Sequence, residues 1–278
     1  MKLVVLAPID NSPFALAVAE LARREPGVEL AGLVVRSILN PSRLRGELRR
    51  DGVRLVRKVW RKLVVGAPAA AGSPEPGFQA LVDELGLGHR SLARFAREHG
   101  VSYLKVADHN EDSSIAFLAA REPDAVAFTG GGLIRRPLLE VAGRGIFNSH
   151  MGILPEYRGM DVVEWPLIEG RQQSVGLGVT LHLIDAGVDT GPIVEKRAVP
   201  IRPADTMETL RTRYEPVMVE LMLEGIRRVR DRTLDPSPQQ PGDGRQYFVL
   251  HPRLYQEARR RLARLAGSDA AHAAGHST

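Results

Sequence analysis

Three polar side chains near the middle of the chain have the chemistry that acyl transfer requires: Asn148, His150 and Asp189. The apolar residues 145–147 predict a buried strand, and side chains two residues apart on a strand point to the same side. An asparagine NH2 can donate to a developing oxyanion, an imidazole can donate or move a proton, and a carboxylate can orient the imidazole or accept the proton of an attacking amine. Asp185 lies in the same turn-rich segment as Asp189 and is the competing carboxylate.

The segments around these residues form a recognisable pattern. A turn-rich loop, Leu154-Pro155 to Arg158-Gly159, follows the Asn-x-His pair, and Asp189-Thr190-Gly191 follows further along the chain. With these three elements in this order, the chain resembles the folate-dependent formyltransferase family over residues 1–200. The resemblance implies N10-formyltetrahydrofolate as the formyl donor. It calls for no metal, and the histidines lack the spacing of metal ligands.

The resemblance also implies roles for individual residues. It makes Asn148, His150 and Asp189 catalytic. It implies a folate-binding set, which consists of Gly131, Leu133, Ile134, Asp185 and Gly187. Candidates for binding the acceptor are Asn11, Ser12, Tyr157, Arg158 and His182. Structural alternatives stay open: the glycines at 130–132 also suit a tight turn, and Arg158 could pair with a neighbouring carboxylate.

The strand and helix signals predict the fold class. Lys2–Ala7 and Val28–Val35 read as buried strands, and between them Ser12 and Pro13 are suited to the N-cap and first position of a helix. Further strands are expected at 100–106, 124–129, 179–184 and 191–200, and a long helix at 206–230. We therefore predict an α/β fold: a Rossmann-like, mostly parallel sheet flanked by helices, with a short C-terminal extension.

The domain boundaries follow from composition. Residues 1–234 are expected to form the formyltransferase catalytic domain, residues 235–266 an extension of linker, strand and basic helix, and residues 267–278 a disordered tail. Methionyl-tRNA formyltransferases of the family carry a C-terminal β-barrel, whereas this extension predicts one strand. We therefore expect tRNA to be disfavoured as a substrate.

The composition of the chain limits its expected partners and location. Lys and Arg number 38 against 33 Asp and Glu, a net charge of +5 that permits a polyanionic partner. A basic amphipathic helix predicted at 42–62 could bind nucleic acid, a phosphorylated substrate or an anionic membrane, or could simply coat the surface. No cysteine is present, and no apolar run approaches membrane-spanning length, so we predict a cytoplasmic protein. The sequence does not define an oligomeric state.

The residues of the first turn limit which acceptor molecules we expect. Residues 7–12 contain no glycine and add the carboxylate of Asp10, which disfavours a phosphate at this turn. Family members that act on glycinamide ribonucleotide carry a glycine-rich loop here, and Ser12-Pro13-Phe14-Ala15 looks more like the methionyl-tRNA and sugar enzymes. We predict formyl transfer to a primary amine of a small molecule, such as an amino sugar or a modified amino acid.

Three alternatives remain open. One is a formyltetrahydrofolate hydrolase, although related hydrolases carry a preceding regulatory domain and the first strand here is expected at Lys2. Another is an enzyme like the methionyl-tRNA formyltransferases without the usual barrel. The third is a non-catalytic protein that binds polyanions through its basic segments, which predicts salt-dependent binding and no folate affinity.

Overall fold

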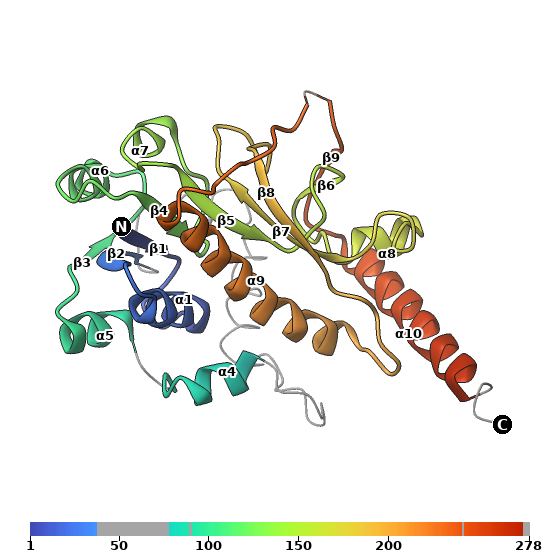
Figure 1. Cartoon of the computed structure of the whole chain (residues 1–278). Coiled ribbons are helices and arrows are strands. Elements are labelled where there is room, and N and C mark those ends of the chain that lie inside the picture. The colour runs from blue at the N-terminus through green and yellow to red at the C-terminus, as the bar shows by residue number, and fades with distance from the viewer. Residues whose placement is uncertain (38–77, 89–90, 241, 275–278) are drawn as a thin grey trace, which may run out of the picture.

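A seven-stranded sheet lies at the centre of the structure, a computed structural model that describes residues 1–37, 78–88, 91–240 and 242–274 (Figure 1). The strand order is β3-β2-β1-β4-β5-β7-β8. The strands span Lys2–Ala7 (β1), Glu29–Arg36 (β2), Tyr103–Val106 (β3), Ala125–Phe128 (β4), Ile146–His150 (β5), Gly178–Leu183 (β7) and Ile193–Ala198 (β8). β1 to β5 pair in parallel, and β7 runs antiparallel to both of its neighbours. The predicted Rossmann-like, mostly parallel sheet is confirmed, whereas the predicted basic helix at 42–62 lies outside the described residues.

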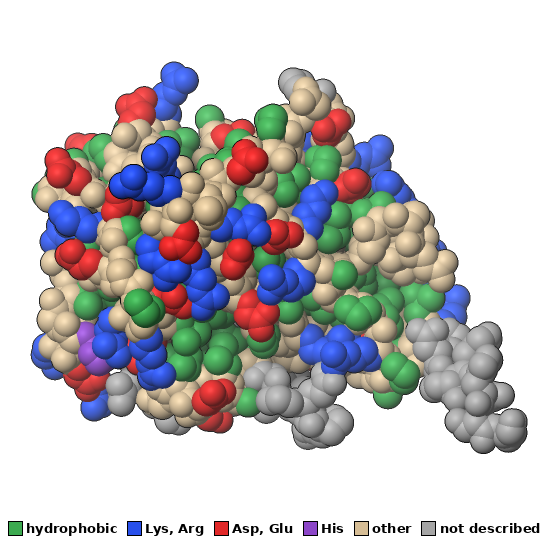
Figure 2. All heavy atoms as spheres, viewed as in Figure 1, with side chains coloured by type: hydrophobic (Ala, Val, Ile, Leu, Met, Phe, Trp, Pro, Cys, Tyr) green, Lys and Arg blue, Asp and Glu red, His purple; other side chains and the backbone are tan. Residues whose placement is uncertain are grey.

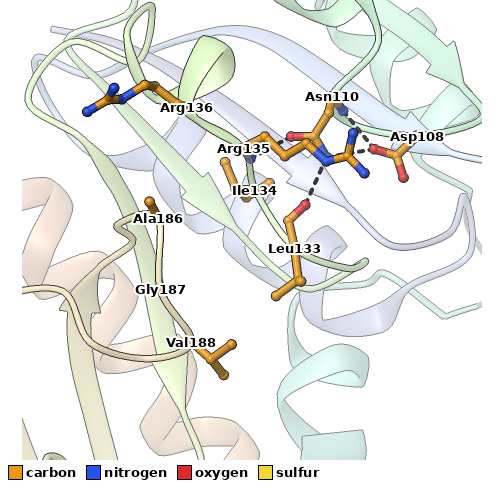
Figure 3. A pocket seen from close by; sticks show the side chains of 9 residues that line it. All are labelled: Asp108, Asn110, Leu133, Ile134, Arg135, Arg136, Ala186, Gly187 and Val188. Carbon is orange, nitrogen blue, oxygen red and sulfur yellow. Dashed lines mark hydrogen bonds between the residues drawn. The ribbon is translucent and has the colours of Figure 1, made fainter.

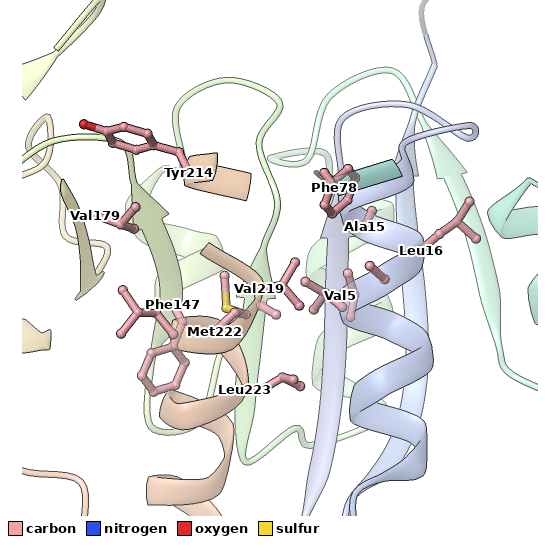
Figure 4. Close-up of a cluster of buried hydrophobic side chains, with 14 of the residues drawn as sticks. Val5, Ala15, Leu16, Phe78, Phe147, Val179, Tyr214, Val219, Met222 and Leu223 are labelled. Atoms are coloured by element: carbon pink, nitrogen blue, oxygen red, sulfur yellow. The ribbon is translucent and has the colours of Figure 1, made fainter. Parts of the chain in front are cut away.

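Helices cover both faces of the sheet because successive strand residues point to opposite sides. On β1, Leu3 and Val5 belong to one hydrophobic cluster and Val4 and Leu6 to another. The first cluster is covered by α1 (Pro13–Arg24), α4 (Phe78–Glu84), α5 (Leu92–His99) and α9 (Met207–Arg230), and the second by α6 (Asp112–Ala119) and α7 (Arg136–Leu139). Figure 4 shows side chains of the first cluster, with Phe147 of β5 packed beside Met222 of α9.

Two helix starts show why the sequence folds this way locally. Ser12 caps α1, because its hydroxyl accepts the N–H of Ala15 at 3.2 Å and Pro13 occupies the first turn, as predicted. α9 begins with a capping box in which Thr206 and Thr209 each accept the other's backbone N–H. Both caps fix helices that pack on the face of the sheet to which Phe147 of β5 points.

The C-terminal extension docks on the loop after β5. Within that loop, β6 (Tyr157–Gly159) pairs in parallel with β9 (Arg245–Tyr247), forming a separate two-stranded sheet. α8 (Trp165–Glu169) follows β6, and α10 (Pro252–Ala274) packs against α8. We expected the last helix to end at 266 and residues 267–278 to be disordered, but α10 continues to Ala274. This stretch is rich in alanine, which has the highest helix propensity, and this favours the continuation of the helix.

No helix among the described residues is long and apolar enough to cross a bilayer.

A buried histidine in the loop after β3 predicts a specific pH dependence of stability. His109 is 1% exposed and packs edge-on against Phe128. Burial lowers the pKa of His109 to about 4, although Asp108 and the nearby carbonyls of Gly130 and Ala7 oppose the shift. Because the folded-state pKa lies below the ordinary value of 6.5, the unfolded chain binds the proton first as the pH falls.

We expect His109 to contribute a loss of about 3 kcal/mol in the free energy of unfolding between about pH 6.5 and about pH 4. His109→Leu should lack this component, so its stability curve should be flatter than that of the natural protein over this range. Urea unfolding at several pH values measures both curves. A slope unaffected by His109→Leu would contradict the assignment.

Candidate acyl-transfer site

Asn148 and His182 face each other across the antiparallel pair β5–β7, where they are direct register partners. The side-chain Nδ2 of Asn148 lies 3.0 Å from Nε2 of His182, and Nδ1 of His182 lies 2.9 Å from the carbonyl oxygen of Leu183. A carbonyl only accepts, so Nδ1 carries a proton, and in the neutral ring Nε2 accepts from Asn148. This contact uses one N–H of the Asn148 amide and leaves the second for another partner.

His150 leaves β5 on the same side as Asn148, as the spacing predicts, although both residues lie within the strand rather than beyond its end. Its Nε2 donates to the carbonyl of Tyr157 at 2.8 Å, and its Nδ1 lies 3.5 Å from Oδ2 of Asp189. Burial lowers the pKa of His150, and the Asp189 carboxylate and the Tyr157 carbonyl offset part of this effect. The ring is therefore fixed in orientation with a carboxylate at one nitrogen.

Asp189 joins the two imidazoles. Its Oδ1 lies 3.5 Å from Nε2 of His182, and its Oδ2 accepts the backbone N–H of Gly159 at 2.8 Å in addition to facing His150. Burial alone would raise the pKa of Asp189. The Gly159 N–H and, when the rings are protonated, a hydrogen bond from His182 and the charges of both imidazoles outweigh burial and lower the pKa to about 2. The carboxylate is thus ionised at neutral pH and available as a proton acceptor.

Asp185, the competing carboxylate, is occupied within its own loop. Oδ1 accepts the Gly187 N–H at 3.0 Å and the Thr190 hydroxyl at 2.7 Å. This is the bonding of a turn-forming aspartate. The structure therefore places Asp189, and not Asp185, against the imidazoles.

A cavity of about 260 Å³ opens beside this cluster. Its lining combines polar groups of the cluster with apolar residues of the following loop: Asn148, Ser149, His150, Met151, Gly159, Met160, Asp161, Val162, Val163 and Arg211. Arg211 makes a bidentate ion pair with the fully buried Glu164, so its charge is already matched. We call this cavity the inner pocket.

A second cavity of about 440 Å³, the outer pocket, lies between the loop after β4 and the loop after β7 (Figure 3). It is lined by Asp108, Asn110, Leu133, Ile134, Arg135, Arg136, Ala186, Gly187 and Val188. Of the predicted folate-binding residues, Leu133, Ile134 and Gly187 line it, whereas Gly131 and Asp185 do not. Gly131 instead lies against His109, where a side chain would collide with the imidazole.

The predicted acceptor residues other than His182 are dispersed. Asn11 is exposed, and Ser12 is occupied in capping α1. The side chain of Tyr157 is buried, donates to Glu169 at 2.8 Å and lines neither pocket. Arg158 forms no ion pair with any residue that the structure describes, and its buried Nε has no hydrogen-bond partner there.

Several residues that line the outer pocket were not predicted from the sequence. The side chain of Asn110 donates to the carbonyl of Leu133 at 2.8 Å and accepts the N–H of Arg135 at 2.6 Å, which fixes one wall of the outer pocket. Asp108 and Asn110 follow β3 directly, so the rule that loops after parallel strands carry ligand contacts could have identified them. Over the described ranges, no group of three or more His, Asp or Glu side chains is placed to hold a metal ion.

A carboxylate held between two imidazoles, beside an amide with an unused N–H, has the components of an acyl-transfer site on an α/β sheet. Comparison with known proteins agrees with this class: residues 89–226 match the family model described as formyl transferase. Those residues therefore belong to the formyl transferase family.

The chain is also similar in sequence to individual proteins. The chain is 32% identical over 149 residues to a methionyl-tRNA formyltransferase of Thermodesulfovibrio yellowstonii, a match that covers 53% of this chain and 47% of that protein. The chain thus spans about half the length of the curated relatives it matches.

Solved structures share the fold. Glycinamide ribonucleotide transformylase 1 from Symbiobacterium toebii is 22% identical, with a TM-score of 0.53 and coverage of 90% of this chain and 94% of that chain. WlaRD, a sugar 3N-formyl transferase solved in the presence of dTDP and 5-N-formyl-THF, is 16% identical, with a TM-score of 0.52 and coverage of 89% and 69%.

Proposed function

We propose that this domain transfers a formyl group from N10-formyltetrahydrofolate to a primary amine of a small molecule. The observation that carries the proposal is the placement of Asp189 within 3.5 Å of both His150 and His182, next to the unused N–H of Asn148. The family membership of residues 89–226 supports formyl transfer as the reaction.

The residues of the site can divide the reaction between them. The attacking amine forms a bond to the formyl carbon while charge develops on the formyl oxygen, and the bond from that carbon to the donor nitrogen then breaks. Asn148 would donate its second N–H to the charged oxygen, where a preorganised neutral donor is effective. Asp189 would accept the proton of the attacking amine directly or through water and return it to the leaving nitrogen. The imidazoles of His150 and His182, whose other ring nitrogens are held by backbone carbonyls, would orient the carboxylate.

The outer pocket suits a folate donor. Leu133, Ile134 and Val188 supply apolar surface for a flat ring, and Arg135 and Arg136 supply cations for the carboxylates of a glutamate tail. The donor supplies an activated one-carbon group, and residues of this chain would supply the hydrogen-bond donor to the charged oxygen and the acceptor of the amine proton. WlaRD, which shares the fold, was solved in the presence of 5-N-formyl-THF, which supports a folate as the donor.

The inner pocket favours a small acceptor. Its volume of about 260 Å³ is below the usual size of a drug-sized ligand site, and Met151, Met160, Val162 and Val163 line it with apolar surface. On the face shown in Figure 2, basic and acidic side chains are interspersed, which is not the single-sign surface that nucleic-acid binding favours. A methionyl-tRNA acceptor is the second candidate, because the curated relatives that match half of the chain carry that name.

The test measures tetrahydrofolate release from N10-formyltetrahydrofolate with four additions: none, methionyl-tRNA, a nucleotide-linked amino sugar, and an extract of small amines analysed by mass spectrometry. Release only with a small amine, together with a formylated product, is the expected result. Formylation of the tRNA would select the second candidate, and formate released without an acceptor would identify a hydrolase. Asp189→Asn run in parallel shows whether any release depends on the site.

A further inference from the structure

The C-terminal extension reaches the loop that carries Asp189. From the end of α9 it passes β8, where Ser237 and Ile193 exchange two backbone hydrogen bonds of 2.7 and 2.8 Å (Figure 1). Two residues further on, the side chain of Gln239 turns into the loop. Its Nε2 donates to the carbonyl of Asp189 at 3.1 Å and to the carbonyl of Gly191 at 2.6 Å.

The two hydrogen-bond partners of Gln239 determine the orientation of its side-chain amide. Both partners are carbonyl oxygens, which only accept, so the NH2 end of the amide must face the loop. Asp189 itself has φ of +53°, a left-handed conformation that is uncommon for residues other than glycine, although aspartate tolerates it in turns. Gln239 binds the backbone at this residue and two residues beyond it, so it secures the turn that aims the carboxylate.

The extension also controls the other contact that places the carboxylate. Oδ2 of Asp189 accepts the N–H of Gly159 at the end of β6, and β6 is paired with β9 of the extension. The ladder continues past the strand, where Met160 donates to the carbonyl of Tyr247 at 3.0 Å. Gly159 has φ of +98° and lies so close to the Tyr247 carbonyl that no side chain fits there.

Polar and aromatic contacts hold this pairing together. The rings of Tyr157 and Tyr247 stack with centroids 5.0 Å apart, and both hydroxyls donate to the carboxylate of Glu169. The same Tyr157 presents its carbonyl to Nε2 of His150. The backbone contacts to His150 and to Asp189 thus both come from β6, the strand that pairs with β9 of the extension.

We propose that the C-terminal extension positions the proposed catalytic pair, and that Gln239 is a positioning residue that sets where the Asp189 carboxylate lies relative to His150. The catalytic consequence rests on the proposed function, whereas the geometric consequence does not. Gln239 touches neither pocket, so it acts only through the loop it binds.

The test replaces Gln239 by Met, which has nearly the same size and apolar reach but no donor. The matched control is Gln240→Met at the exposed neighbouring position, where the side chain lies outside both pockets. We expect Gln239→Met to lower kcat by about ten- to a hundredfold with KM for the donor nearly unchanged, because small displacements of reacting groups have effects of this size. Gln240→Met should match the natural protein.

A second readout does not depend on the reaction. The Asp189 carboxylate raises the pKa of His150, so a carboxylate that has moved away should let the His150 titration fall to lower pH. NMR of the imidazole resonances, with His150 assigned through His150→Gln, measures this in the full chain without any substrate. A merely structural loss of folded protein would reduce signal without moving the titration.

The outcomes separate the two proposals. A lowered His150 titration in Gln239→Met supports the positioning role even if no acceptor is ever formylated, in which case the proposed function fails alone. An unmoved titration and an unchanged kcat in a folded Gln239→Met protein overturn the positioning role while leaving formyl transfer intact. If Gln239→Met does not fold, Gln239→Asn, which keeps a neutral amide but shortens its reach by one methylene, carries the same test, and an unmoved titration with an unchanged kcat there would also overturn the role.

Discussion

Asp189→Asn is expected to lower kcat for formyl transfer by about 10³- to 10⁴-fold, the size of effect seen when a carboxylate that orients a catalytic histidine becomes an amide. Asparagine has nearly the same shape and tolerates the left-handed φ of +53°, and its side-chain oxygen can still accept the Gly159 N–H. The fold of the loop should therefore persist while the charge facing His150 and His182 is lost. Single-turnover formylation of the identified acceptor, with donor affinity measured separately, provides the test.

The same substitution at Asp185 is the control for this prediction, because both carboxylates belong to one loop. Asp185 accepts the Gly187 N–H and the Thr190 hydroxyl, and weakening such contacts has effects of about tenfold or less. A loss at Asp185→Asn equal to that at Asp189→Asn would mean that both variants act by disordering the loop. A loss confined to Asp185 would reverse the assignment of the two carboxylates.

Strand β5 illustrates what the sequence could predict. The apolar run at 145–147 and the two-residue spacing of Asn148 and His150 depend only on local strand geometry, and both predictions are confirmed. The central parallel strands follow from short apolar runs between turn signals, which is again local information. Local patterns therefore located the strand and the direction in which its polar side chains point.

Contacts set by pairing register were not predictable in the same way. His182 meets Asn148 because β5 and β7 run antiparallel in one particular register, and nothing in either segment alone fixes that register. Tyr157 was expected beside the acceptor, but its neighbours in the motif do not reveal which face of β6 is covered by Tyr247. Gln239 lies in a segment whose composition reads only as a linker, and its partner Asp189 is fifty residues earlier in the chain.

Asn148→Ala is expected to lower kcat by about 10²- to 10³-fold, the usual cost of removing one side-chain donor to a developing oxyanion. One N–H of the amide is held by His182 at 3.0 Å, and this contact aims the second N–H at the inner pocket that Asn148 and His150 line. Since the donor bears on the charged oxygen more than on the neutral formyl group, KM should change little. Single-turnover rates and donor titration separate these two quantities.

Asn148→Asp distinguishes this role from a purely structural one. A carboxylate keeps the size of the amide and could accept a hydrogen bond from His182 when that ring is protonated, so it would preserve a merely structural contact with the ring. It cannot donate to an oxyanion, however, and it places a negative charge where the formyl oxygen becomes negative. We therefore expect Asn148→Asp to be at least as slow as Asn148→Ala, and a variant that retained most of the natural rate would show that Asn148 only orients His182.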